Sequence, residues 1–85
     1  MAPHERIDDP LAWVDARFEK NAICPVRFRW KQREFAVQAV HARWVDRRTR
    51  PTRYYFAVTV ATGEAMELCY REGDPVWTLT QVDTV

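Results

Sequence analysis

The sequence has no serine, and only two glycines, two cysteines and two histidines among its 85 residues. A serine nucleophile is therefore excluded, and there is no glycine-rich loop that could cradle phosphate groups. No apolar run approaches the ~20 residues of a membrane-spanning helix, so we expect no membrane partner. Because the sequence contains no catalytic apparatus, we expect a protein that is not an enzyme and holds no cofactor.

The two cysteines, Cys24 and Cys69, are too few for a disulfide framework, although a single bridge between them stays open. Together with His4 and His41 they could supply four zinc ligands, but no two of them have the short spacing typical of such ligands, and we expect no metal site. The first residues lack the apolar segment of a signal peptide. We therefore expect a cytoplasmic protein with both thiols reduced.

The composition is typical of a single folded domain, because 47% of the residues are hydrophobic and 29% are charged. Near the N-terminus, Asp9 and Pro10 form a favourable helix start. Leu11, Val14 and Phe18 then recur on one side of a helix. This pattern predicts an amphipathic helix in segment 9–21, preceded by a flexible tail over residues 1–8 and packed on the rest of the domain.

Residues 22–85 alternate apolar and polar side chains, which predicts strands at 26–30, 34–45, 54–60, 66–70 and 76–82. Gly63 marks a hairpin turn, and residues 31–33 form a turn without glycine, expected to be a type I variety or a three-residue loop. In the second strand the alternation changes phase, which predicts a β-bulge near Gln38 and Ala39. The expected fold is mainly β (α+β): a five-stranded antiparallel meander curled into a small half-open barrel, with the N-terminal helix on it.

Positive charge is concentrated in residues 27–53, where nine basic residues face only Glu34 and Asp46. Eight of the nine are arginines, whose planar guanidinium suits phosphate groups. The candidate binding residues are these nine and the exposed Tyr55: Arg27, Arg29, Lys31, Arg33, Arg43, Arg47, Arg48, Arg50, Arg53 and Tyr55.

Basic side chains beside an exposed aromatic ring are typical of proteins that bind single-stranded nucleic acids. The alternative is a solvated strand face whose arginines pair with glutamates on neighbouring strands, namely Glu34, Glu64, Glu67 and Glu72. The sequence pI of about 7.8 favours this alternative, because basic nucleic-acid-binding domains usually exceed ~9. Most other aromatic residues alternate in strand register and are expected in the core: Trp30, Trp44, Tyr54, Phe56, Tyr70 and Trp77.

From Pro25 onward the spacing of residues forms a set of motifs: Pro25-x-x-Phe28-x-Trp30, Phe35-x-Val37, Val40-x-x-x-Trp44, Arg53-Tyr54-Tyr55-x-x-Val58, Gly63, Glu67-Leu68, Trp77-x-Leu79 and Val82. Over about residues 25–82 this set resembles a bacterial family of uncharacterised small β-rich domains. Members stand alone or lie at the C-terminus of Y-family DNA polymerase homologues that serve in mutagenic translesion synthesis. The resemblance implies a binding module associated with DNA repair that mediates assembly rather than chemistry.

The sequence departs from the polymerase-linked members in two respects. It includes no polymerase, and Trp44-Val45 stands where those members have two adjacent tryptophans. The resemblance therefore implies the fold more strongly than the repair role.

The leading functional hypothesis is a non-enzymatic binding module whose basic strand face and 46–53 loop dock a nucleic acid or an acidic protein surface. The alternative is a protein-interaction or homo-oligomeric module in which an exposed strand edge pairs with a second copy of the chain.

Overall fold

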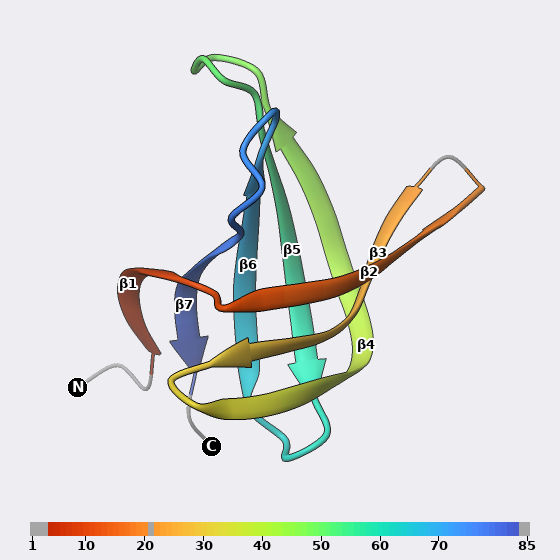
Figure 1. Cartoon of the computed structure of the whole chain (residues 1–85), viewed down its shortest axis with the longest axis vertical. Helices are drawn as coiled ribbons and strands as arrows, with labels where there is room; N and C mark the ends of the chain where they lie inside the picture. Colours follow the sequence, from red (N-terminus) through yellow and green to blue (C-terminus); the bar gives the residue numbers. More distant parts are fainter. Residues whose placement is uncertain (1–3, 21, 84–85) are drawn as a thin grey trace.

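The chain folds into one seven-stranded antiparallel sheet that curls on itself, and the computed structural model describes residues 4–20 and 22–83, with the side chains of residues 4–6 left out (Figure 1). The order across the sheet is β1-β7-β6-β5-β4-β3-β2. The strands are β1 (His4–Pro10), β2 (Trp13–Glu19), β3 (Ala22–Trp30), β4 (Arg33–Asp46), β5 (Arg53–Val60), β6 (Ala65–Arg71) and β7 (Thr78–Asp83).

Strand β4 belongs to both layers of the curled sheet. Its residues 33–36 pair with β3, whereas residues 37–46 pair with β5. In Figure 1, β2 and β3 therefore pass in front of the layer formed by β5, β6 and β7. The second half of β4 and the first half of β3 are not paired as neighbouring strands, so the two layers diverge like the sides of a half-barrel.

Two register shifts interrupt the pairing of β4 with β5. The first lies between Val37 and Ala39, where the sequence predicted a bulge, and the prediction is confirmed. The second lies between Val40 and Ala42 and was not predicted. Because each extra residue reverses which face the following side chains occupy, the second shift places Trp44 on the outer face of the sheet. The prediction that Trp44 lies in the core is therefore wrong.

The segment between β1 and β2 bridges the two ends of the curled sheet. The backbone N–H of Leu11 donates to the carbonyl of Trp77 at 2.8 Å, and that of Ala12 donates to the carbonyl of Arg29 at 3.0 Å. Leu11 is 4% exposed and joins the core. These contacts hold the β7 side of the sheet against the β3 side, which gives the molecule its curled half-barrel shape.

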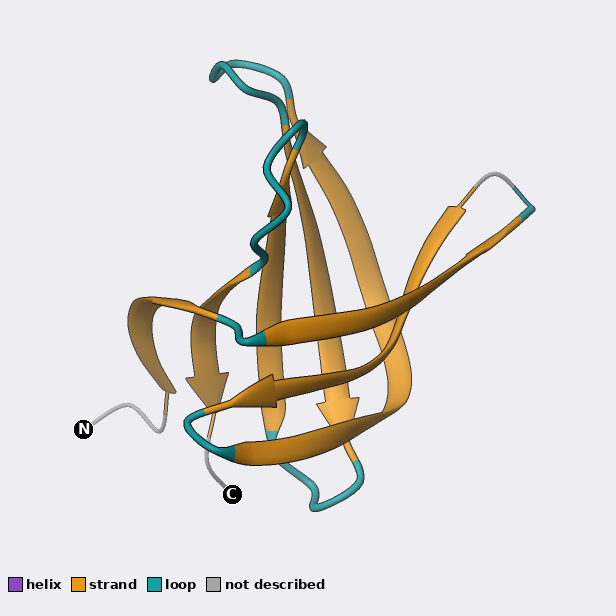
Figure 2. Cartoon of the chain, viewed as in Figure 1, coloured by secondary structure: helices purple, strands orange, loops and turns teal. Residues whose placement is uncertain are grey.

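The expected α+β fold with five strands and an N-terminal helix is wrong. The described residues contain strands, loops and turns without a helix (Figure 2). They accordingly include no helix of the length and apolar character needed to cross a membrane. The segment expected to form the helix, 9–21, instead supplies the end of β1 and all of β2, with Asn21 outside the described residues. Residues 4–8 of the expected tail lie in β1.

The helical pattern fails because pairing in the sheet outweighs local propensity. Leu11 is buried but Phe18 is 79% exposed, so they do not share a buried stripe. In β2 the half-buried Val14 and Ala16 alternate with exposed neighbours, a period of two that the same sequence also satisfies. Helix propensities differ by less than ~1 kcal/mol per ordinary residue, which the backbone hydrogen bonds and burial gained by pairing with β3 exceed. From residue 22 onward the five expected strands correspond to β3–β7, although β3 begins four residues earlier and β7 two residues later than expected.

The core lies between the two layers and is built from side chains of every strand or of the segments beside it. Its buried members are Leu11, Phe28, Phe35, Phe56, Val58, Val60, Met66, Leu68 and Leu79. Phe28 stacks on Phe35 with ring centroids 5.4 Å apart. Of the aromatic residues predicted for the core, Phe56 is buried, and the half-buried ones that pack against it or its neighbours are Trp30, Tyr54, Tyr70 and Trp77.

The turn between β3 and β4 consists of Lys31 and Gln32 alone, and both have positive φ values, 50° and 66°. Positive φ at both central residues is typical of a type I′ turn, which matches the twist of paired strands. The turn is therefore neither the type I variety nor the three-residue loop expected from the sequence. An L-residue in this region costs roughly 1–2 kcal/mol, so this turn carries strain.

Replacing Gln32 by glycine should relieve that strain and raise the free energy of unfolding by about 1 kcal/mol, since glycine adopts positive φ freely. Urea unfolding followed by tryptophan fluorescence measures the change. Gln38→Gly, within β4 and without a positive φ, is the matched control and should destabilise the protein. Equal destabilisation by both substitutions would contradict the strained turn.

Candidate functional site

The predicted basic residues do not form one surface. Arg27, Arg29, Lys31 and Arg33 lie on the hairpin that joins β3 to β4, shown in yellow in the lower part of Figure 1. The others lie on the second half of β4, on the loop of residues 47–52 at the top of the same view, and at the start of β5. The two groups therefore occupy opposite ends of the molecule.

The basic residues of the β3–β4 hairpin are largely engaged within it. Arg29 pairs with Glu34 across the hairpin, with 3.7 Å between guanidinium nitrogen and carboxylate oxygen. The Lys31 ammonium lies 5.0 Å from the centroid of the Trp30 ring, and the Arg33 guanidinium lies at the same distance from that of Phe35. For this group the structure favours the alternative of an ordinary solvated strand face.

Arg43 also has a structural role, because the second bulge of β4 places its side chain on the face that looks toward the β2–β3 hairpin. Its Nε donates to the carbonyl of Ile23 at 3.4 Å, and its Nη2 lies 3.1 Å from the Cys24 sulfur. Beside this contact is an open hollow of about 240 Å³, lined mostly by apolar residues that include Val45 and Phe56. Arg43 thus ties the diverging layers together.

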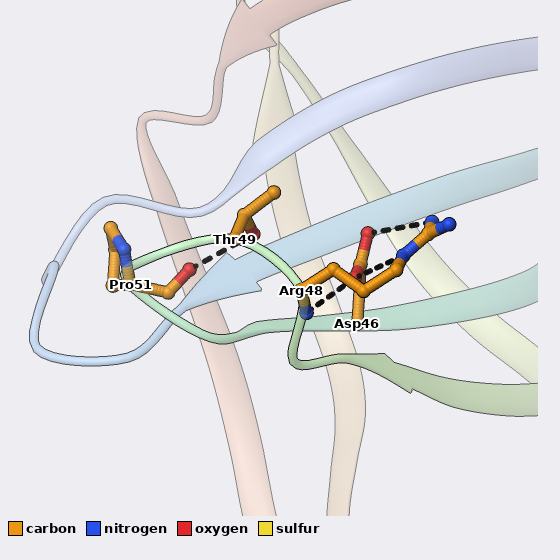
Figure 3. A network of polar contacts seen from close by, with 4 residues as sticks. All are labelled: Asp46, Arg48, Thr49 and Pro51. Atoms are coloured by element: carbon orange, nitrogen blue, oxygen red, sulfur yellow. Dashed lines mark hydrogen bonds and ion pairs between the residues drawn. The ribbon is translucent and has the colours of Figure 1, made fainter.

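The loop of residues 47–52 is organised around Asp46 (Figure 3). The Asp46 carboxylate accepts hydrogen bonds from the backbone N–H of Arg48 at 3.0 Å and from its guanidinium at 3.1 and 3.3 Å. The Arg48 side chain thereby holds the pKa of Asp46 below its ordinary value. Arg47 and Arg50 are exposed and, within the described part of the chain, form no ion pair or side-chain hydrogen bond.

An aromatic pair and two arginines lie together on the outer face of β4, β5 and β6. Trp44 and Tyr55 are direct partners across β4 and β5, and their rings stack with centroids 5.4 Å apart and planes 7° from parallel. Trp44 is 42% exposed. Arg53, two residues before Tyr55, shares its face and lies directly opposite Arg71 on β6. We call these four residues the aromatic–arginine patch.

The charges of Arg53 and Arg71 are not balanced within the patch. Like charges directly opposite each other in a sheet are destabilising. The Nε atoms of both side chains are buried, and neither has a hydrogen-bond partner among the described residues. Asp46 is the register partner of Arg53, and its oxygens accept hydrogen bonds from Arg48. A hydrogen bond to Tyr55 and, to a smaller extent, the nearby charge of Asp46 raise the pKa of Arg53. The patch therefore presents two closely placed positive charges, only partly offset by Asp46, beside the exposed ring of Trp44.

Cys69 lies under the patch, opposite Tyr55 in the register of β5 and β6. It is 3% exposed, and this burial raises the pKa of its thiol, even though the Tyr55 hydroxyl and the charges of Arg53 and Arg71 favour the thiolate. Cys24 and Cys69 are both free thiols. In the portion of the chain that the structure describes, no three His, Cys, Asp or Glu side chains gather as a metal site would require.

Sequence reasoning missed two members of the patch. Trp44 was assigned to the core because the second bulge in β4 leaves no mark in the sequence. Arg71 was not considered, although a hairpin turn at Gly63 that pairs Thr59 with Ala65 also pairs Arg53 with Arg71. Counting the register outward from that turn would have found it.

The fold and the patch together define a small antiparallel β half-barrel with a basic, aromatic surface on one face of its sheet. The chain belongs to the family described as domain of unknown function DUF6504, whose model matches residues 1–84. This confirms the expected membership of a family of uncharacterised small domains. No curated protein matches the chain, and no solved structure does.

The buried thiol of Cys69 should react more slowly than that of Cys24 with a disulfide reagent near pH 8, because a raised pKa leaves less of Cys69 as the reactive thiolate. The variants Cys24→Ala and Cys69→Ala, each retaining one thiol, separate the two rates. Guanidinium-unfolded protein is the control in which both thiols should react alike. Faster reaction of Cys69 in the folded protein would contradict its burial under the patch.

Proposed function

We propose that the protein is a non-enzymatic module that binds single-stranded nucleic acid through the aromatic–arginine patch. The observation that carries this proposal is the stacked pair of Trp44 and Tyr55 on the outer face of the sheet, beside two arginines that lie directly opposite each other on β5 and β6. Proteins that bind single strands without strong sequence preference combine these same two elements, a stacking surface and positive charge along the backbone path.

The chemistry of each part is distinct. The exposed ring of Trp44 supplies a face on which a base stacks, and every base has such a face, so this contact tolerates any sequence. The guanidinium groups of Arg53 and Arg71 supply positive charge, and their planar form suits a phosphate group. Arg47 and Arg50, exposed on the adjoining loop, extend the positive charge beyond the sheet. The hairpin arginines at the other end of the molecule have no part in this proposal.

The resemblance to domains at the C-terminus of Y-family polymerase homologues suggests where such binding would act. A single-stranded DNA template is exposed during translesion synthesis, and a module that binds this template would serve DNA repair in the cytoplasm of a bacterium. We include this context in the proposal because an aromatic side chain can stack on the face of an unpaired base, whereas in a duplex the base faces are covered by neighbouring bases.

Labelled single-stranded oligonucleotides should bind the protein with an affinity that falls steeply between about 50 and 200 mM salt, since phosphate contacts release counterions. Fluorescence anisotropy measures this, and the double variant Arg47→Glu, Arg50→Glu should abolish binding at the higher salt. The control variant Arg27→Glu, Arg33→Glu makes the same change in net charge at the opposite end and should bind nearly as the parent does. Absence of binding to any oligonucleotide at low salt would refute the proposal and leave an acidic protein surface as the partner to test.

Trp44→Ala should weaken binding of single strands by about tenfold or more, because stacking of one base on an aromatic side chain contributes roughly 1–3 kcal/mol. The ring is exposed, so the variant should remain folded. Trp13→Ala removes a similarly exposed ring from β2, away from the patch, and serves as the matched control. An equal loss of affinity in both variants would show that the stack is not the binding surface.

A further inference from the structure

Strand β2 ends the sheet with an unpaired edge. It pairs with β3 on one side, and no strand of the described residues pairs with its other side. An edge of this kind carries a row of free N–H and C=O groups that another strand can extend. The register shift in the β2–β3 pair skips Val26 of β3, so β2 itself runs through Trp13–Glu19 without an extra residue.

The two edges of the sheet differ in how they resist such pairing. At the other end, β1 contains a register shift between Arg6 and Asp9 and finishes at Pro10, which has no N–H to donate. These are devices that protect an edge. Strand β2 has neither a bulge of its own nor a proline, and its Phe18 is 79% exposed.

The sequence of β2 is complementary to itself when two copies run antiparallel about Ala16. In that register Asp15 lies opposite Arg17 of the second copy, and Val14 lies opposite its Phe18. Directly opposed residues project on the same face, so the charged pair falls on the exposed face and the apolar pair on the face of the core. Each contact occurs twice because the arrangement has two-fold symmetry.

The neighbouring registers lack this complementarity. An axis at Asp15 would oppose two aspartates, and an axis at Arg17 would oppose two arginines, both of which destabilise the pair. An axis between residues would set Asp15 of the charged face opposite Ala16 of the apolar face, which the pleat of a continuous sheet does not allow. An axis at Phe18 would also oppose unlike charges, Arg17 and Glu19, but it would pair only residues 17–19 of the strand. The axis at Ala16 pairs the whole of β2, Trp13–Glu19, and opposes both unlike charges and apolar side chains.

We propose that the protein forms a two-fold symmetric dimer in which the β2 strands of two copies pair antiparallel about Ala16 to make one continuous sheet. The second copy covers Phe18, which the monomer leaves exposed. A seven-residue strand pair buries less surface than a standard interface, so the dimer belongs to the weak, concentration-dependent class. The aromatic–arginine patch lies on other strands, and the dimer does not depend on nucleic-acid binding.

Charge reversal tests the register as well as the dimer. Sedimentation velocity of the parent protein over a range of micromolar concentrations should show a reversible monomer–dimer equilibrium. The variants Asp15→Arg and Arg17→Glu each place like charges opposite one another and should raise the dimer dissociation constant about tenfold or more. Both sites are exposed, so neither variant should lose its fold.

Two rescues follow from the same register. The doubly exchanged variant Asp15→Arg, Arg17→Glu restores opposite charges and should dimerise like the parent. An equimolar mixture of the two single variants should form a heterodimer, since each then opposes the charges that the other presents. Arg33→Glu, a charge reversal on β4 away from the edge, is the control and should leave dimerisation unchanged.

A parent protein that stays monomeric throughout the concentration range would overturn the proposal. Dimerisation that persists equally in both single variants, or fails to return in the exchanged variant and in the mixture, would overturn the proposed edge and register. The oligonucleotide-binding experiment reads out a separate surface, so either proposal can fail while the other holds.

Discussion

The shared strand β4 is the constraint on which the rest of the structure depends. One half pairs with β3 and the other with β5, so both layers exist only because this strand bends from one into the other. Two register shifts lie in the bending part, near Gln38 and His41, and bulges of this kind increase local twist and bend a strand. Between the two shifts the even-numbered Val40 faces the core. After the second shift the even-numbered residues face outward again, as they do before the first, so Trp44 lies on the outer face.

The aromatic–arginine patch follows from that phase and from the register of the β5–β6 hairpin. Trp44 meets Tyr55 only after the second shift, and Arg53 meets Arg71 because the hairpin turns at Gly63. Opposed arginines cost stability, and for Arg53 the hydrogen bond to Tyr55 and the charge of Asp46 offset part of that cost. The proposed binding of an anionic partner depends on this surface. Charge density along the sequence alone does not distinguish these arginines from the hairpin group.

The two edge strands of the sheet, β1 and β2, differ in how readily a further strand can pair with them. Pro10 and the irregular pairing of β1 limit extension there, whereas β2 presents an uninterrupted edge with opposite charges at Asp15 and Arg17. That segment carries helix-start signals as well as strand alternation, and the local sequence supports both. Pairing with β3 decides between them, since a strand there gives β3 a partner on its second side.

From Ala22 onward the sequence alone determined the strands, the turn at Gly63 and the first bulge of β4, because residues with period-two burial and a glycine with positive φ are local signals. The sequence also showed that arginines are concentrated in residues 27–53, but it did not show which of them lie together in the fold. Tertiary structure alone decided that residues 4–10 and 13–19 form strands, that Trp44 faces outward and that Arg71 joins Arg53. The physical reason is that strand pairing joins residues far apart in sequence. One inserted residue also moves every following side chain of the strand to the opposite face of the sheet.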